Sequence, residues 1–253
     1  MGNSAVAETV LTNGKGGNPV TVYVGYGIGL FLGILISGGV SGGHLNPAVT
    51  VAGAIVGKFK RVKVFHYLIA QYLGAFVAAA FTYLVYIDSF KAFHGDLPMN
   101  QTTASIFATY PKSDLSVIGS VIDQILGSMV LIFAIYAATD KKNTNVPPHL
   151  VSVYVTLTLI GIACSLGINQ GFAVNPARDL SPRIFTYLAG WGNQVFSSET
   201  YWYVPIVGPH IGALIGALLY ISLIEKLRKN EDDRFYLPPP EIKQFTYSNP
   251  VCE

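Results

Sequence analysis

Two stretches of the chain decide the fold: GGHLNPAVT at residues 42–50 and GFAVNPARD at residues 171–179. Each contains Asn-Pro-Ala, follows a long apolar run and opens a short one, Val49–Val56 in the first case and Ile184–Ala189 in the second. Asn is favoured at a helix N-cap and Pro at the first helical position, so each motif predicts the start of a short helix. Because the pattern occurs twice in corresponding places, we expect two related half-helices in two repeats.

Five apolar runs around these motifs are long enough to cross a membrane, which takes about 20 helical residues. They are Thr21–Val40, Val64–Ile87, Val117–Ala138, Leu150–Gly167 and Val204–Ile224. Charged residues make up only 12% of the 253 residues, whereas a soluble domain carries about 25%. The net charge of +2 gives no reason to expect a nucleic-acid partner, and two cysteines cannot form a disulfide scaffold. The expected fold class is an all-α membrane protein with five full spans.

The half-helices predict where a solute passes. A helix that begins inside the membrane points its positive end at whatever lies beyond its N-cap. In an inverted repeat, two such ends meet near the midplane, where membrane proteins handle small solutes. The Gly-rich backbone before each Asn would expose carbonyl groups, which a membrane tolerates only around a wet cavity. We therefore expect an inverted repeat with two re-entrant half-helices around a hydrated path.

Loop charges predict the orientation of the chain. Eleven Lys and Arg residues fall in the loops after the first and third spans and in the C-terminal tail, against three on the opposite side. This predicts an extracellular segment over residues 1–20, a membrane domain over 21–227 and a cytoplasmic tail over 228–253. The sequon at Asn100 lies on the outer side. The first repeat shows no leading span before its own half-helix, so that span is expected to be absent.

From Gly2 to Leu227 the chain resembles the aquaporin, or major intrinsic protein, family, and within it the aquaglyceroporins. The resemblance rests on SGGHLNPAVT at 41–50, AQYLGA at 70–75, GFAVNPARD at 171–179, SPR at 181–183, AGWG at 189–192 and VPIVGP at 204–209. Asp179 directly after Arg178 is similar to the glycerol-conducting branch. The resemblance implies a passive channel for glycerol, water and other small uncharged solutes such as urea, which excludes ions and protons. It also implies a homotetramer in the lipid bilayer, at the plasma membrane, with no cofactor, metal or catalytic residue.

The same resemblance assigns the pore residues. It implies that Asn46 and Asn175 donate hydrogen bonds to the solute at mid-membrane, where neutral amides need no counter-ion. It places the selectivity constriction at Tyr26, Ala163, Phe172 and Arg178, and His44 and Asp179 complete the expected pore set. Two aromatic walls opposite an arginine, with a small residue beside them, favour a solute of the size of glycerol.

Two alternatives remain open from the sequence. Residues 39–43, with Ser41 at the centre, fit the Gly-x-Ser-x-Gly pattern of a nucleophile, and His210 could serve as the base of a rhomboid-like intramembrane serine protease. However, that pattern in soluble hydrolases needs a strand–turn–helix context, which these spans do not supply. The other alternative is a non-conducting, truncated channel homologue that acts as an interaction protein.

Overall fold

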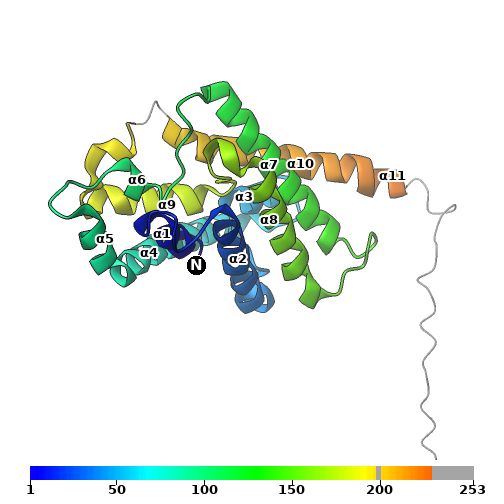
Figure 1. Ribbon diagram of the computed structural model, residues 1–253. Coiled ribbons are helices and arrows are strands. Elements are labelled where there is room, and N and C mark those ends of the chain that lie inside the picture. The colour runs from blue at the N-terminus through cyan, green and yellow to red at the C-terminus, as the bar shows by residue number, and fades with distance from the viewer. Residues whose placement is uncertain (198–200, 230–253) are drawn as a thin grey trace, which may run out of the picture.

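The computed structural model describes residues 1–197 and 201–229, and within these ranges all regular secondary structure is helical (Figure 1). The five long helices are α2 (Pro19–Ser41), α4 (Val64–Val85), α7 (Val117–Thr139), α8 (Val151–Gln170) and α10 (Val204–Tyr220). All five are long and apolar enough to cross a membrane, so the five predicted spans are confirmed. The polar tail beyond residue 229, which includes Pro238–Pro240, lies outside the described residues.

The two short helices begin at the Asn-Pro-Ala motifs, as the sequence predicts. Helix α3 (Pro47–Ile55) starts after Asn46, and α9 (Pro176–Thr186) starts after Asn175. In both cases the Asn has an extended backbone and its side chain accepts a hydrogen bond from the first turn, while Pro occupies the first helical position. Local sequence therefore fixes where each half-helix begins.

The second repeat, α7 to α10, is packed along its whole length. Gly208, Gly212 and Gly216 place the backbone of α10 directly against α7, because a Cβ at any of them would collide with Gln124, Ile125 or the Met129–Ile132 turn. Small residues at four-residue spacing permit this close approach between membrane helices. Helix α8 lies against both α7 and α2, and so joins the two repeats.

The first repeat begins with a ten-residue helix, α1 (Gly2–Leu11), which lies beside α2 (Figure 1). A Cβ at Gly25 would lie 2.7 Å from the Cβ of Ala5, and one at Gly29 would lie 3.5 Å from the Cβ of Met1. Helix α1 therefore packs against the middle of a span, which differs from the expectation of a wholly extracellular segment over residues 1–20. At 1.5 Å per residue its length is about 15 Å, or half of a hydrocarbon core.

The loop between α4 and α7 contains two short helices that the sequence did not predict. They are α5 (Ile87–His94) and α6 (Gln101–Ala104). Phe90 and Phe107 of this loop pack with Trp191 and with Ala7 of α1 in one buried cluster. This cluster therefore joins the α4–α7 loop and α1 to the segment that follows α9.

Short turns connect the remaining elements. They are η1 (Arg61–Lys63), η2 (Pro148–Leu150), η3 (Tyr187–Trp191), η4 (Gly192–Val195), η5 (Tyr201–Tyr203), η6 (Ile221–Glu225) and the final turn α11 (Lys226–Lys229). The last of these is tied to the α7–α8 loop, because Asp140 accepts hydrogen bonds from Tyr220 at 2.9 Å and from Arg228 at 2.8 Å. Partial burial opposes ionisation of Asp140, but these hydrogen bonds and one from the Lys142 N–H hold its pKa below its ordinary value.

Candidate functional site

The two Asn-Pro-Ala motifs meet through a reciprocal pair of hydrogen bonds. The Asn46 amide donates to the carbonyl of Val174, which precedes Asn175, at 2.8 Å. The Asn175 amide donates to the carbonyl of Leu45, which precedes Asn46, at 2.9 Å. Each side-chain oxygen meanwhile caps its own half-helix, at 2.9 Å to the Ala48 N–H and 3.1 Å to the Ala177 N–H. Because an amide carries two donor hydrogens, each Asn keeps one N–H for a passing solute.

A glutamine from a neighbouring span holds each re-entrant loop. Gln124 of α7 accepts the Val174 N–H at 2.8 Å. Gln71 of α4 donates to the His44 carbonyl at 2.8 Å and to the Thr50 hydroxyl at 2.9 Å. The second loop is the more strained, because Val174 has a φ of +40°, and a β-branched residue rarely adopts a positive φ.

An inner cavity of about 240 Å³ lies along the meeting point of the half-helices. One water needs only about 10–15 Å³ of such space, so the cavity holds a column of waters or a small polyol. Its polar groups come from Asn46, Asn175 and Arg178, and His44 lies at one end. The remaining wall is apolar and comes from α2, α3, α7, α8 and the second re-entrant loop: Leu30, Ile34, Val49, Leu131, Ile135, Val155, Leu159 and Phe172.

A second cavity of about 370 Å³ lies between the outer loops, α1 and the end of α8. Within the described ranges, the residues that line both cavities are Tyr26, Phe172 and Arg178. These three side chains therefore mark the boundary between an outer vestibule and the inner cavity. Three of the four residues expected at the constriction lie together there.

The boundary has two aromatic walls and one cation. The Arg178 guanidinium carbon lies 4.4 Å from the centre of the Tyr26 ring. The Phe172 ring stands edge-to-face against Tyr26, with centroids 5.5 Å apart, and against Tyr23 at 5.4 Å. Arg178 donates from Nη1 to the Phe107 carbonyl at 3.3 Å, while its buried Nε has no protein partner among the described residues. The guanidinium thus keeps donor capacity for a solute.

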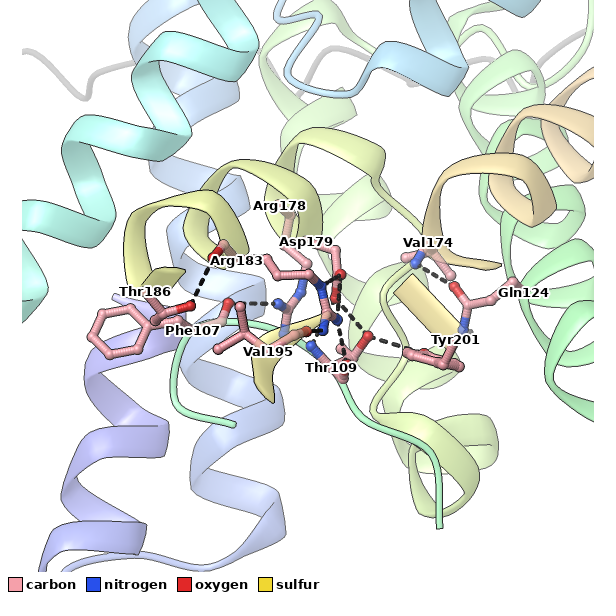
Figure 2. A network of polar contacts seen from close by, with 10 residues as sticks. All are labelled: Phe107, Thr109, Gln124, Val174, Arg178, Asp179, Arg183, Thr186, Val195 and Tyr201. Atoms are coloured by element: carbon pink, nitrogen blue, oxygen red, sulfur yellow. Dashed lines mark hydrogen bonds and ion pairs between the residues drawn. The ribbon is translucent and has the colours of Figure 1, made fainter. Parts of the chain in front are cut away.

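Asp179 does not line either cavity, which corrects its expected place in the pore. Figure 2 shows it in a buried network behind Arg178. Its carboxylate accepts from the Thr109 N–H at 2.7 Å and pairs with Arg183 at 2.8 Å, and both side chains are about 1% exposed. Thr109 also contacts the Tyr201 hydroxyl at 3.0 Å. Asp179 and Arg183 therefore brace the outer loop against α9.

Ala163 is also absent from the residues that line the two cavities. It is fully buried on α8, in the apolar cluster that contains Phe172 and Val174. His44 lines the inner cavity as expected, and its ring stacks on Phe59 with centroids 4.7 Å apart.

The apolar wall of the inner cavity was missed in the sequence. Leu131, Val155 and Leu159 lie on α7 and α8, where apolar residues occur on every face, so no pattern separates a lumen-facing leucine from a packed one. A second omission is Asn3 on α1, which accepts a hydrogen bond from Tyr26 at 2.7 Å.

The two residues of the protease alternative, Ser41 and His210, bond to backbone carbonyl groups of their own helices. The Ser41 hydroxyl donates to the Ser37 carbonyl at 3.1 Å, and His210 Nδ1 contacts the Ile206 carbonyl at 2.7 Å. Both are bonds within a single helix, and they do not join a nucleophile to a base. In the part of the chain that the structure describes, no group of three His, Cys, Asp or Glu side chains could hold a metal ion.

The fold and the site together define a membrane channel built from an inverted repeat with two half-helices. The profile of the family described as Major intrinsic protein matches residues 2–220, and the chain belongs to this family. Aquaporin-9 of Homo sapiens is 41% identical over 251 residues, which cover 98% of this chain and 85% of that protein. Aquaglyceroporin-2 of Rhizophagus irregularis is 45% identical over 228 residues, which cover 88% of this chain and 72% of the relative.

A solved structure supports the same assignment. The X-ray structure of the aquaglyceroporin from Plasmodium falciparum matches with a TM-score of 0.82 and 28% identity, over 90% of this chain and 92% of that one. The chain is therefore an integral membrane channel of the aquaglyceroporin branch, which conducts glycerol and water. The protease and the non-conducting homologue are not favoured.

Proposed function

We propose that this channel selects its solutes where Tyr26, Phe172 and Arg178 separate the outer vestibule from the inner cavity. The observation that carries the proposal is that these side chains line both cavities. Any solute that passes from one cavity to the other contacts all three. The selected class comprises glycerol and other small uncharged solutes, urea included, together with water.

The chemistry of the boundary matches a polyol. The rings of Tyr26 and Phe172 that line both cavities offer apolar carbon atoms for a carbon backbone, while Arg178 offers planar donors for hydroxyl oxygens. A sugar such as sucrose is too wide for two aromatic walls that already contact each other.

Beyond the boundary, the crossed asparagines orient the solute. Asn46 and Asn175 each keep one amide N–H, and the positive ends of α3 and α9 face the same point. A water there turns its oxygen toward the donors, which interrupts a chain of hydrogen-bonded waters and opposes cations. This arrangement supports exclusion of protons and ions.

The setting of the channel is part of the proposal. Many large apolar side chains are exposed on the span surfaces, among them Phe81 at 63% and Leu84 at 60% on α4 and Leu157 at 60% on α8. Such surfaces suit lipid and neighbouring protomers. We infer a homotetramer in the plasma membrane, with the C-terminus in the cytoplasm, as the loop charges predict.

Stopped-flow light scattering of proteoliposomes tests the proposed function. In a glycerol gradient, vesicles with the protein should shrink and then re-swell quickly as glycerol enters, whereas in a sucrose gradient they should shrink and stay shrunken. A pH gradient across the same vesicles should decay no faster than in protein-free vesicles. Glycerol re-swelling no faster than in protein-free vesicles would favour a non-conducting homologue instead.

A further inference from the structure

Tyr26 is the only boundary side chain among the three that carries a hydroxyl, and this hydroxyl is tied to α1. It donates to Oδ1 of Asn3 at 2.7 Å. Asn3 does not belong to the described lining of either cavity, whereas Tyr26 belongs to both. The hydroxyl therefore has its acceptor on α1, across the seam between α1 and α2, while the ring lines both cavities.

The ring of Tyr26 is held from two sides. On one side, the backbone of α1 lies against it, since a Cβ at Gly2 would collide with the Tyr26 ring atoms. On the other side, the Arg178 guanidinium lies 4.4 Å from the ring centre. The hydroxyl lies on the ring axis, so it can reach another partner only if the whole side chain tilts about its Cα–Cβ bond, and the hydrogen bond to Asn3 opposes that tilt.

A buried tyrosine hydroxyl that loses its hydrogen bond is destabilised by the cost of the unsatisfied polar group. Conformations in which the hydroxyl finds another donor or acceptor are therefore favoured. Beside Tyr26, the alternatives are the water or solute in the lumen and the guanidinium of Arg178. Either one draws the hydroxyl into the boundary, where it narrows the opening and competes with the solute for Arg178.

We propose that Asn3 is a specificity-determining positioning residue, which keeps the constriction wide and apolar on its Tyr26 side by binding the Tyr26 hydroxyl. This inference rests on the proposed role of Tyr26, Phe172 and Arg178 as the selective boundary. Asn3 acts through Tyr26 and does not contact the solute. Its loss should affect glycerol, which needs the apolar wall and the full width, more than it affects water.

A double-mutant cycle in proteoliposomes tests the proposal, with the ratio of glycerol to water permeability as the readout. Asn3→Ala in the otherwise unchanged chain should lower this ratio about fivefold, the factor to which one net hydrogen bond corresponds. Tyr26→Phe sets a reference ratio of its own. In that background, where no hydroxyl remains to be held, Asn3→Ala should change the ratio no further.

A matched control separates this effect from loosening of α1. Tyr86→Phe removes another side-chain hydrogen bond that anchors α1, from the Tyr86 hydroxyl to Oε1 of Glu8 at 2.9 Å, far from the boundary. It should leave the permeability ratio unchanged. An equal drop in the ratio with Tyr86→Phe would overturn the proposal, because docking of α1 as a whole would then set the constriction.

Two further results would also overturn the role of Asn3. One is an unchanged ratio with Asn3→Ala alone. The other is the same loss with Asn3→Ala in both backgrounds, since an effect that does not need the hydroxyl is structural. Failure of the proposed function gives a different result, namely no glycerol flux in the unmodified chain.

Discussion

Replacing Asp179 separates a role in the scaffold from a role in the pore. One carboxylate oxygen accepts from the Thr109 N–H at 2.7 Å and from its hydroxyl at 2.5 Å, and the other pairs with Arg183 at 2.8 Å. Both charged side chains are about 1% exposed. Asp179→Asn keeps the size of the side chain but removes its charge, and so leaves the Arg183 guanidinium buried without a counter-ion.

The expected loss of stability follows from these contacts. Breaking a buried ion pair by removing one partner costs about 3–5 kcal/mol. Arg183 keeps its bonds to the Val195 carbonyl at 2.7 Å and the Thr109 carbonyl at 2.6 Å, so we expect a cost of about 3 kcal/mol, at the lower end. For a chain of this size, about 2–4 °C is lost per kcal/mol, so the apparent melting temperature should fall by about 6–12 °C.

Thermal unfolding in detergent, combined with flux per folded protein, measures both effects. Asp179→Asn should lower the melting temperature while the protein that remains folded keeps its ratio of glycerol to water permeability. Asp88→Asn is the control, because the Asp88–Lys91 pair is exposed and 3.5 Å long and should contribute nothing measurable. An unchanged melting temperature with an altered permeability ratio would refute the reasoning and return Asp179 to the pore.

Two further predictions concern the wall and the contact between Asp140 and Arg228. Ala163→His should narrow the constriction and cut glycerol flux far more than water flux, because Ala163 is fully buried in the apolar cluster that contains Phe172 and a larger side chain there must displace its neighbours; equal loss of both would indicate damaged folding. The pKa of Asp140 in the folded state lies below its ordinary value, so its contact with Arg228 should be complete at neutral pH and lost only below about pH 4. The melting temperature of the unmodified chain and of Asp140→Asn, measured as the pH is lowered, would show this.

The half-helices and spans were predictable because their signals are local. Asn followed by Pro caps and starts a helix regardless of its surroundings, and a run of about 20 apolar residues has few alternatives to a span. The crossed bonds of Asn46 and Asn175 follow once two such motifs meet head to head.

What the sequence did not show depends on contacts between distant segments. Helix α1 is ten residues long, and a helix of that length is marginal by itself. It forms against the face of α2 that carries Gly25 and Gly29, and although their four-residue spacing permits close helix packing, it does not show which segment packs there. The role of Asn3 could not be predicted for the same reason, because its partner Tyr26 is 23 residues away.

Two site residues were misplaced for different reasons. Ala163 lies on a span that is apolar on every side, so its sequence neighbours do not show which face points to the lumen. For Asp179 a signal was present: Arg183 follows four residues later, the spacing of an ion pair along one helix face. The expected place of Asp179 in the pore followed the family resemblance, whereas the structure shows the ion pair that the spacing indicates.

The size limit of permeation in Phe172→Ala tests the central claim most directly. Phe172 stands edge-to-face against both Tyr26 and Tyr23, so its removal opens one wall of the boundary without touching Arg178. In proteoliposomes the unmodified chain should pass glycerol and exclude six-carbon polyols such as sorbitol, and Phe172→Ala should admit sorbitol. If the variant stays folded and conducts glycerol but has the same size limit as the unmodified chain, selection occurs elsewhere and the account is contradicted.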